Sequence, residues 1–580
     1  MKDRVNSYSV KPLKGKWRIY FLLILFVFVF GAVIYRLFLI QVVRHSFYTA
    51  VAQGQYEFSK KINPERGGIF LQDKDGSVVP LAINREYFKV YAVPREINAQ
   101  TKPIVAQKLS TILGMGEKEI FEKIDKNDPY EPLKSKLDEK TAEQIKSLNL
   151  AGVYLASENW RWYPQGDLAS QVVGFVGFQG NQKVGQYGLE AYYEKQLAGQ
   201  PGFLKAERDA LGQSIFTGAS YDLQPAQNGD NLFLTIDPNI QFVAEQKLKA
   251  VLEKWQSPGG SVIITDPKTG AIRAMASFPN FNPNNYFQVE DISVFSNPAI
   301  QKRFEPGSIF KPITMAAGLD LNKVTPETTY TDTGSVMIDN HVITNAANRS
   351  YGLSSMTKVL EKSINTGAVF VQRTIGNALF RKYVEAFGLN QLTNVDLFGE
   401  VKGDINNLNE GSPQINFATA SFGQGIAVTP LEIVSAIGAI ANNGKLMRPY
   451  LVDKIVRADG QEEKTQPQMI RQVISPQAAA KLTAMLVSTV RNGYDKIKIK
   501  GYFIAGKTGT AQVPNENSRG YTDETIHSFV GYAPAYDPKF LIFLKMDKPK
   551  GINFASNSLA PTFAEIANYL FNYYEIPPEE

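Results

Sequence analysis

The sequence predicts an α/β (α+β) protein with one mainly antiparallel sheet in its C-terminal half, a smaller α+β region before it and one membrane-spanning helix. Three observations lead to this expectation. An uncharged apolar segment lies near the N-terminus, and a stretch rich in Gly, Ser, Gln and Pro occupies residues 210–230. After that stretch, short β-branched segments precede and follow a long helical middle. The 580 residues suffice for two or three domains.

The first element is an apolar segment that carries no charge from Ile19 to Tyr35 and continues through Ile40 after Arg36. Crossing the hydrocarbon core of a membrane takes roughly 20 apolar residues. A cleaved signal peptide is the alternative, but the stretch is longer than a typical signal h-region and no small-residue cleavage site follows Val33. We therefore expect an uncleaved anchor over residues 19–40.

Basic residues gather before this segment and set its expected orientation. They are Lys2, Arg4, Lys11, Lys14, Lys16 and Arg18, with only Asp3 opposing them. The positive-inside rule then predicts a cytoplasmic tail over residues 1–18 and everything after about residue 41 outside the bacterial cytoplasmic (inner) membrane.

The next region, residues 41–225, is expected to form a first domain without a catalytic constellation. A mixed polar and apolar helix is predicted over 41–60, a strand over 87–93, and helices over 118–126 and 139–148. The second domain is expected to cover residues 226–580. Strands are predicted at 232–236, 261–265, 271–277, 502–505, 528–533 and 540–546, with a helix over 238–255.

Composition excludes several kinds of site. The chain has no cysteine, so thiolate nucleophiles, thiolate metal sites and disulfides are excluded. Its three histidines, His45, His341 and His527, are widely scattered, and we expect no metal and no cofactor. The net charge of +6 comes without a long Lys/Arg block, and so no nucleic-acid partner is expected.

Three short motifs could carry chemistry. They are Ser308-Ile309-Phe310-Lys311, Ser363-Ile364-Asn365 and Lys507-Thr508-Gly509-Thr510. None is distinctive alone, since a Ser-x-x-Lys match is expected about twice by chance in a chain of this length. The chain also holds competing matches, namely Ser355-Met356-Thr357-Lys358, Ser157-Glu158-Asn159 and Lys268-Thr269-Gly270.

The surroundings of Ser308 favour it over Ser355. Pro312 and the run 313–319 predict a helix that starts at Ser308, which would put Lys311 one turn further on the same face. Free backbone N–H groups gather at a helix N-terminus, where an oxyanion can form. Ser355 is instead expected on the same helix as Ser363, so that the two motifs could not converge from different directions.

The other competing matches are expected in turns and loops, whereas the third motif follows a strand. Lys268-Thr269-Gly270 is predicted in a hairpin turn and residues 157–159 in a loop. Lys507-Thr508-Gly509 follows the predicted strand 502–505, and Gly509 is expected to let a substrate backbone approach closely.

In this order and spacing the three motifs resemble the penicillin-recognising serine transferases, a group that comprises the penicillin-binding proteins and the serine β-lactamases. The resemblance covers roughly residues 60–570. In the first domain it is carried by Arg66-Gly67-Gly68-Ile69, Asp73-Lys74-Asp75-Gly76, Leu81-Ala82, Arg161, Tyr163-Pro164, Gly174-Phe175-Val176-Gly177 and Gly185-Gln186-Tyr187-Gly188-Leu189-Glu190. In the second it is carried by Leu234-Thr235-Ile236-Asp237, Gln241, Arg303-Phe304-Glu305-Pro306-Gly307-Ser308 and residues 506–512. One departure is Leu71-Gln72 before Asp73, where such proteins run directly into Asp-Arg.

The residues themselves suggest how Ser308 would be activated. A serine nucleophile needs a base, and no histidine is placed for it. Lys311 can serve only if it is neutral, and burial together with the nearby charge of Lys507 would lower its pKa. General-base action typically contributes about 10²–10⁴-fold.

The resemblance implies the remaining roles. Ser308, Lys311, Ser363 and Thr510 would be catalytic, with Ser363 relaying a proton and the N–H groups of Ser308 and Thr510 binding the oxyanion. Asn365, Lys507, Thr508, Gly509 and Thr510 would bind the substrate.

The resemblance is greatest to the class B, monofunctional penicillin-binding proteins, whose fold pairs a penicillin-binding transpeptidase domain with an elongated pedestal domain. It implies a peptidoglycan D,D-transpeptidase with stem peptides ending in D-Ala–D-Ala as substrate, β-lactams as covalent inhibitors and a membrane-embedded glycan polymerase as partner. Septal and side-wall synthesis both stay open.

Four alternatives stay beside this reading: a β-lactamase, a D,D-carboxypeptidase, a β-lactam sensor and a bifunctional enzyme with a glycosyltransferase. A dedicated deacylating Glu-x-x-Leu-Asn is not present, because the segment from Glu385 to Asn390 is one residue too long. Residues 41–225 also hold no Glu-Asp motif of the glycosyltransferase kind.

Overall fold

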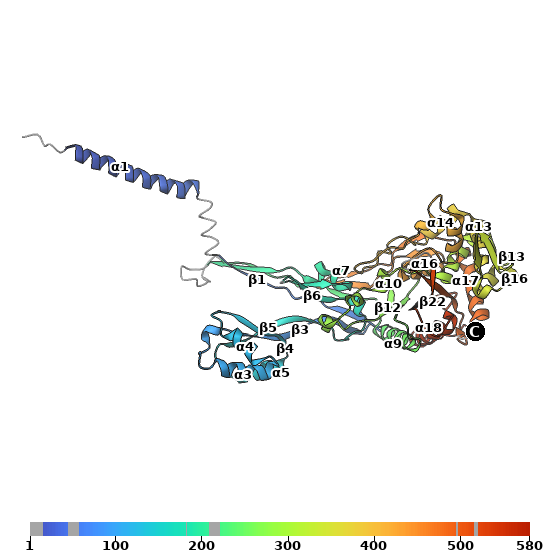
Figure 1. The fold of residues 1–580 in the computed structure, drawn as a ribbon, viewed down its shortest axis with the longest axis horizontal. Coiled ribbons are helices and arrows are strands. Elements are labelled where there is room, and N and C mark those ends of the chain that lie inside the picture. The colour runs from blue at the N-terminus through green and yellow to red at the C-terminus, as the bar shows by residue number, and fades with distance from the viewer. Residues whose placement is uncertain are drawn as a thin grey trace, which may run out of the picture. The chain divides into compact units, whose positions relative to one another are not determined.

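The computed structural model describes residues 16–44, 57–180, 182–207, 221–494, 497–515 and 520–579. Figure 1 shows the helices and strands of the chain, which divides into two compact units. The first comprises residues 1–64 and 200–227, and the second comprises residues 65–199 and 228–580. Each unit is described by itself.

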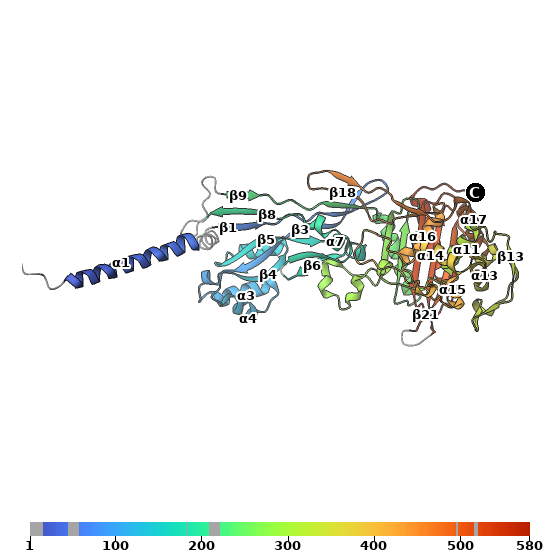
Figure 2. The same cartoon turned by 90° about the horizontal axis from the view of Figure 1, so that it is seen from above.

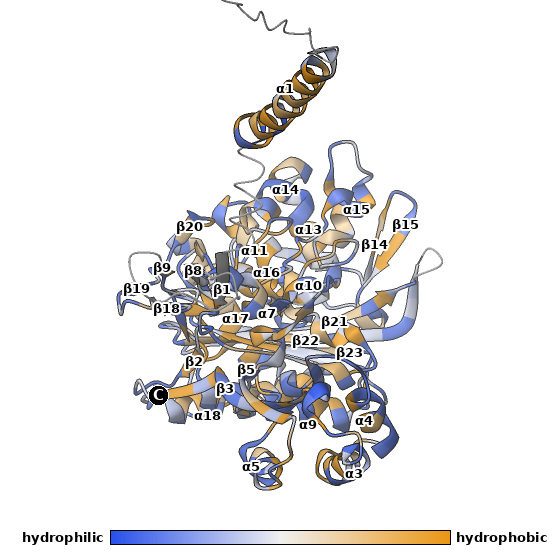
Figure 3. Ribbon diagram, turned by 90° about the vertical axis from the view of Figure 1, so that its left-hand side faces the viewer, coloured by the Kyte–Doolittle hydropathy of each residue, from blue (hydrophilic) through white to orange (hydrophobic). Residues whose placement is uncertain are grey.

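The first unit contains the apolar helix. α1, Lys16–Phe38, continues into one π-helical turn, η1, Leu39–Val43. Figure 3 colours α1 hydrophobic along most of its length, and over Ile19–Val43 it is long and apolar enough to span a membrane. Its 23 residues rise about 35 Å, which exceeds the ~30 Å hydrocarbon core. The predicted anchor, 19–40, lies within this segment.

The first unit also holds a three-stranded antiparallel sheet in the order β1-β8-β9 (Figure 2). Its strands are β1, Glu57–Ile62, β8, Gly202–Glu207, and β9, Tyr221–Gln224. The expected helix over 41–60 is therefore wrong at its end, since Glu57–Ile62 pairs residue by residue with β8 and so satisfies its backbone in a ladder. Residues 45–56 of that prediction lie outside the described residues.

In the second unit, a seven-stranded mixed sheet runs in the order β19-β18-β10-β2-β3-β4, with β5 paired to β3. The strands are β2, Ile69–Gln72, β3, Val78–Ala92, β4, Glu131–Leu137, β5, Val153–Trp162, β10, Asn231–Leu234, β18, Val452–Val456, and β19, Glu462–Lys464. β10 lies between β2 and β18. The sheet thus joins strands from both sides of the expected domain boundary at residue 225, which itself stays a prediction.

Residues 157–159 lie in β5 and not in the expected loop. They pair with residues 86–88 of β3, and the ladder between these two strands runs from Val153 to Trp162 without a break. Polar side chains are compatible with a strand here because one face of the ladder is open to solvent, as the exposed Ser157 and Asn159 show.

Three helices cover the other face of β3 and β4 with a small apolar core. They are α3, Lys102–Leu113, α4, Glu117–Ile124, and α5, Glu139–Ser147. The boundaries of α4 and α5 agree with the predicted helices to within two residues. Asp138 caps α5 by accepting a hydrogen bond from the Thr141 N–H at 2.8 Å, which fixes where this helix starts.

The buried carboxylate of Glu190 connects three segments of the second unit through hydrogen bonds to Arg66 and Arg161. Glu190 lies in α7, Gly188–Tyr192, and is fully buried. Its Oε1 accepts from Arg161 Nε at 2.6 Å and its Oε2 from Arg66 Nε at 2.7 Å. Burial raises the pKa of Glu190, but the two guanidinium groups outweigh it and hold the pKa below its ordinary value. Removing one arginine would leave a buried charge partly unpaired.

The second sheet is five-stranded, antiparallel throughout as predicted, and ordered β12-β11-β23-β22-β21. Its strands are β11, Gly259–Thr265, β12, Ile272–Phe278, β21, Ala505–Pro514, β22, Tyr521–Ala533, and β23, Phe540–Asp547. Helices α9, Pro238–Lys254, and α18, Ala555–Tyr573, pack on one face. Helices α11, Lys311–Asp320, α16, Pro430–Ala441, and α17, Pro476–Gly493, pack on the other. β21 is an edge strand.

The remaining described elements connect these layers. They are η2, Pro94–Glu96, α6, Ser170–Val173, β6, Phe175–Gln179, β7, Gln182–Gln186, α8, Glu194–Ala198, η3, Pro283–Gln288, η4, Ile292–Phe295, α10, Pro298–Gln301, η5, Gly307–Phe310, β13, Thr329–Asp332, β14, Ser335–Ile338, β15, His341–Thr344, η6, Ala346–Asn348, β16, Gly352–Ser355, α12, Met356–Glu361, α13, Asn365–Ile375, α14, Asn377–Ala386, η7, Asn406–Leu408, α15, Gln414–Ala420, β17, Lys445–Met447, and β20, Met469–Gln472.

Candidate active site

Ser308 lies in the 3₁₀ turn η5, which leads directly into α11. Gly307 adopts φ +56°, and its N–H donates to the Gly423 oxygen at 2.9 Å, which fixes the entry to the turn. Ser308 is half-buried, whereas both residues that flank it are buried. The predicted helix start is correct in place, although the α-helix proper begins at Lys311.

Lys311 is buried, with 1% of its surface exposed. Its Nζ contacts the Ser363 backbone oxygen at 2.6 Å, Asn365 Oδ1 at 2.8 Å and Ser363 Oγ at 3.1 Å. Burial lowers the pKa of Lys311 well below its ordinary value, and the positive charge of Lys507 lowers it further. The structure therefore gives this amine the burial and the cationic neighbour expected from the sequence.

Ser363 connects α12 to α13 and has φ +55°. This left-handed conformation is strained for a residue with a Cβ, and such strain is concentrated at functional sites. Ser355 and Ser363 do not share a helix, contrary to the expectation, because α12 ends at Glu361. Asn365 begins α13, and its Nδ2 donates to the Thr344 oxygen at 2.9 Å, which turns Oδ1 toward Lys311.

The third motif lies within β21, not after a strand over 502–505, since the ladder with β22 starts only at Ala505. Lys507 has 1% of its surface exposed. Its Nζ donates to Ser363 Oγ at 3.0 Å, to Tyr494 Oη at 3.1 Å and to the Thr508 oxygen at 3.2 Å. Two lysine amines from different segments therefore meet at the Ser363 hydroxyl.

Gly509 is required by the packing of β21 within the protein. A Cβ at this position would lie 2.3 Å from Ser528 Oγ, 2.9 Å from the Pro306 oxygen and 3.0 Å from Ile309 Cγ2. Glycine thus lets β21 lie directly against the turn that carries Ser308. The expectation that Gly509 also lets a substrate backbone approach closely stays a prediction.

Thr510 and Thr508 are half-buried on the same strand. Thr510 Oγ1 accepts a hydrogen bond from the N–H of Ala555, the first residue of α18, at 3.2 Å. Thr510 lies opposite His527 of β22. His527 is fully buried, its Nδ1 lies 2.8 Å from Ser558 Oγ, and burial lowers its pKa to about 4. The side-chain hydrogen bond of this histidine is thus to α18.

Tyr494 belongs to the site although the sequence reading missed it. It follows the end of α17, and its Oη lies 2.8 Å from Thr508 Oγ1 and 3.1 Å from Lys507 Nζ. No motif includes this residue, and a tyrosine 13 positions before a lysine carries no sequence signal of its own.

The competing motif matches are occupied by structural contacts. Ser355 caps α12 by accepting from the Lys358 N–H at 3.2 Å, and Lys358 Nζ donates to the Tyr351 oxygen at 3.0 Å. Lys268-Thr269-Gly270 forms the turn between β11 and β12, as predicted, with Lys268 paired to Asp537. Glu385 pairs with Arg381 at 2.9 Å on α14.

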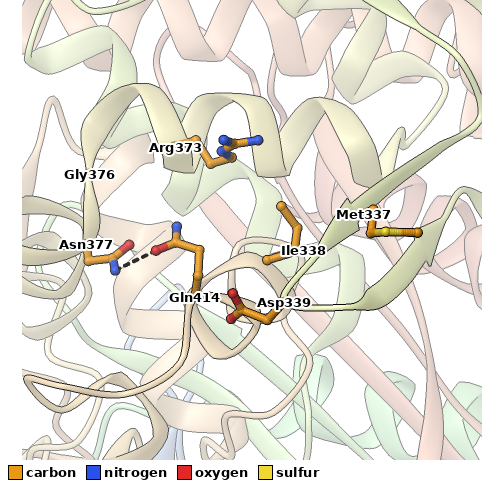
Figure 4. A pocket seen from close by; sticks show the side chains of 7 residues that line it. All are labelled: Met337, Ile338, Asp339, Arg373, Gly376, Asn377 and Gln414. Carbon is orange, nitrogen blue, oxygen red and sulfur yellow. Dashed lines mark hydrogen bonds between the residues drawn. The ribbon is translucent and has the colours of Figure 1, made fainter.

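No predicted site residue lines the open cavity of about 550 Å³ beside β14 and α13 (Figure 4). Its lining consists of Met337, Ile338, Asp339, Arg373, Gly376, Asn377 and Gln414. Across the described part of the chain, no cluster of three His, Cys, Asp or Glu side chains could hold a metal ion. The serine hydroxyl that lies beside both buried lysine amines is that of Ser363.

Comparison with known families gives two matches that cover most of the chain. Residues 260–568 match the penicillin binding protein transpeptidase domain, and residues 61–234 match the penicillin-binding protein dimerisation domain.

Comparison with curated proteins and solved structures agrees. Stage V sporulation protein D of Bacillus subtilis is 33% identical over 558 residues, which cover 94% of this chain and 84% of that protein. The peptidoglycan D,D-transpeptidase FtsI of Buchnera aphidicola is 32% identical over 78% of this chain and 77% of its own. The crystal structure of penicillin-binding protein 3 from Mycobacterium tuberculosis complexed with ampicillin has a TM-score of 0.67 at 25% identity, covering 90% of this chain and 97% of that chain. Penicillin-binding protein 2X from Streptococcus thermophilus shares the fold, with a TM-score of 0.74 at 23% identity and coverage of 90% and 81%.

Proposed function

This chain belongs to the penicillin-binding protein family, and we propose that Ser308 is the nucleophile through which it works as a serine-type peptidoglycan D,D-transpeptidase. One observation carries the proposal. The amines of Lys311 and Lys507, from two distant segments, both lie within hydrogen-bond distance of Ser363 Oγ, and β21 packs against the turn that holds Ser308. Three motifs far apart in the chain therefore meet around one hydroxyl.

The three contacts of Lys311 can be satisfied by a neutral amine that is ready to accept a proton, and its lowered pKa supports that state. A neutral Nζ has two hydrogens and one lone pair. The Ser363 backbone oxygen and Asn365 Oδ1 are acceptors and take the two hydrogens. An ammonium would donate to Ser363 Oγ as well, whereas beside a neutral amine Ser363 Oγ donates its own hydrogen to the lone pair while it accepts from Lys507. With Lys311 neutral, the hydrogen bonds therefore run in one direction, from Lys507 through Ser363 to Lys311.

We propose that acylation uses this arrangement. Ser308 Oγ attacks the carbonyl of the penultimate D-Ala, and its proton passes to Lys311 Nζ as Ser363 turns away from the lone pair. The Lys311 ammonium then protonates Ser363 Oγ, and the Ser363 proton moves to the nitrogen of the departing D-Ala. The C–N bond breaks, an ester to Ser308 remains, and no proton is gained or lost overall.

The position of β21 explains how the substrate can be held. It is an edge strand of the sheet, so an extended stem peptide can add to it as a further strand. The N–H groups of Ser308 and Thr510 would bind the developing oxyanion. Lys507, Thr508 and Thr510 would hold the terminal carboxylate, with Gly509 keeping the strand close to the nucleophile, and Asn365 would hold the substrate backbone.

An amine from a neighbouring stem peptide then attacks the ester and restores Ser308. A D-Ala–D-Ala peptide tested with and without an acceptor amine distinguishes the alternatives. We expect a cross-linked product that depends on the amine, together with slow release of the β-lactam acyl group. Release of D-Ala to water only would indicate a carboxypeptidase, rapid β-lactam hydrolysis a β-lactamase, and stable acylation without peptide turnover a sensor.

We further propose that α1 anchors the chain in the bacterial cytoplasmic membrane with the catalytic part outside. The basic residues before α1 support this orientation, as do the apolar side chains that α1 exposes along its length. The chain has no cysteine, so single introduced cysteines report topology cleanly. In intact cells, Lys118→Cys, at an exposed position of α4, should react with an impermeant maleimide and Lys14→Cys should not. The reverse pattern would contradict the orientation.

Finally, we propose a membrane-embedded glycan polymerase as the partner that supplies uncross-linked strands. The substrate chemistry supports this, because stem peptides must arrive on a growing glycan close to the membrane that holds α1. Copurification of the full chain with such a polymerase should be lost when α1 is replaced by an unrelated spanning helix. Retention after that replacement would show that α1 is not part of the contact.

A further inference from the structure

The structure assigns Tyr494 as a positioning residue that fixes the direction of the Thr508 hydroxyl, so that this hydroxyl donates to the carboxylate of the substrate. The inference rests on the proposed function and extends it to a residue outside the three motifs. It follows from counting donors and acceptors around one phenol oxygen that is almost closed to solvent.

Tyr494 is held in place from two sides. Its backbone N–H donates to the Val490 oxygen at 3.2 Å, so it closes the last turn of α17. Its ring has an edge-to-face contact with Phe529 of β22, with ring centroids 6.3 Å apart, and 8% of the residue is exposed. A buried phenol held in this way has little freedom to seek other hydrogen-bond partners.

The Tyr494 oxygen has one hydrogen and two lone pairs. Lys507 Nζ, at 3.1 Å, can only donate to it, and the Thr508 N–H donates to it at 3.4 Å. These contacts use both lone pairs. The Tyr494 hydrogen is then left for Thr508 Oγ1 at 2.8 Å.

Thr508 Oγ1 is therefore an acceptor toward Tyr494, and its own hydrogen must point elsewhere. Within the described residues this oxygen has no second partner, and Thr508 is half-buried on the edge strand β21. An incoming carboxylate at that edge offers the acceptor that the Thr508 hydrogen lacks. The hydrogen bonds then run in one direction, from the Lys507 ammonium through Tyr494 and Thr508 to the anion.

Such a chain strengthens each of its members, because a donor that itself accepts from a cation is more polarised. This chain of hydrogen bonds also favours substrates that carry a negative charge beside the Thr508 hydroxyl. Tyr494→Phe keeps the ring but removes the phenol oxygen, so the Thr508 hydroxyl can rotate and Lys507 loses one of its three acceptors. The loss should concern carboxylate recognition rather than the reaction of Ser308.

The test compares two acylating agents on the full chain, benzylpenicillin and its methyl ester, which differ in the charge of this carboxylate. We expect Tyr494→Phe to lower the second-order acylation rate with the free acid by about 10- to 100-fold, the range for a hydrogen bond to a charged group. The rate with the ester should stay the same. Tyr532→Phe is the matched control, because it breaks a buried Tyr–Thr pair, with Thr483 at 2.8 Å, outside the site.

An equal loss with both agents would overturn the inference and make Tyr494 a structural residue only. Unchanged rates with both would overturn it as well. If the wild-type chain reacted with neither agent, the proposed function itself would fail, which is a distinct result.

A second variant guards against misfolding of Tyr494→Phe. With 3,5-difluorotyrosine at position 494, the phenol keeps its oxygen and ionises at lower pH than tyrosine. As pH rises through that ionisation, the phenolate can no longer donate, and the preference for the acid over the ester should decline. A preference that stays constant across the ionisation would contradict the assignment.

Discussion

The Nζ atom of Lys311 lies 2.6 Å from the backbone oxygen of Ser363, although the two residues are 52 positions apart in the chain. This contact joins the helix that follows Ser308 to the strained link between α12 and α13. It holds the buried amine at the Ser363 hydroxyl, which Lys507 also contacts. The account of acyl transfer depends on that amine being neutral.

The pH dependence of acylation should report on the Lys311 amine. Because its pKa is lowered, Lys311 is neutral at higher pH and gains a proton as pH falls through that lowered pKa, so acylation should be lost on the acid side. Lys507→Gln removes the positive neighbour, which raises the pKa of Lys311 and should move the acid limb to higher pH. The measurement is the second-order rate with benzylpenicillin across a pH series.

Lys358→Gln is the control for this experiment, since Lys358 belongs to a competing Ser-x-x-Lys match and its Nζ contacts only backbone oxygens, those of Tyr351 and Leu353. Its acid limb should coincide with that of the wild type. An acid limb at the same pH in Lys507→Gln as in the wild type would mean that Lys507 does not lower the pKa of Lys311.

Replacing Ser363 should separate its chemical role from its backbone strain. Ser363→Ala and Ser363→Gly both remove the hydroxyl and should slow acylation roughly 10²–10⁴-fold, the usual contribution of proton transfer by a positioned group. Because φ is +55° here, glycine relieves strain that alanine keeps. Ser363→Gly should therefore have a higher unfolding free energy than Ser363→Ala, by about 1 kcal/mol, and a higher melting temperature. Similar melting temperatures would argue against strain at this link.

His527 should make the fold sensitive to acid. Its pKa is about 4 in the folded protein, below the ordinary value of 6.5, so the native state holds the neutral ring. The stability that it contributes is fully present above pH 6.5 and is lost as pH falls toward 4, on the order of 3 kcal/mol in all. His527→Gln should flatten the fall of melting temperature across this window.

His341→Gln is the matched control, because His341 is exposed on β15. Its melting temperatures should follow the wild-type pH dependence. If His527→Gln followed it as well, acid sensitivity in this window would have to come from other groups.

The sequence was sufficient to predict β11, β12 and β23, because each is a short apolar run with clear ends. It was not sufficient for the longer, more polar β21 and β22, which were expected over 502–505 and 528–533. β23 was expected over 540–546 and runs over Phe540–Asp547. The sequence patterns gave wrong predictions where pairing with a distant strand overrides the local secondary-structure preference. The residues Glu57–Ile62 and 157–159 look like helix and loop, but both form ladders with strands far away in the chain.

From the sequence, only those residues of the candidate site that belong to its three motifs could be predicted. Ser308, Lys311 and Ser363 were named from spacing and context, and the burial of Lys311 followed from the chemistry that a serine requires. Tyr494 could not be found, because its place beside Lys507 is set by where α17 ends against β21. The packing reason for Gly509 was hidden likewise, since it depends on the turn before Ser308.

The most direct measurement is to locate the acyl group after reaction with benzylpenicillin, by mass spectrometry of peptides from the full chain. We predict a single adduct on the peptide that contains Ser308, its loss in Ser308→Ala, and its retention in Ser355→Ala. An adduct on Ser355 or Ser363, or continued labelling of Ser308→Ala, would contradict the account.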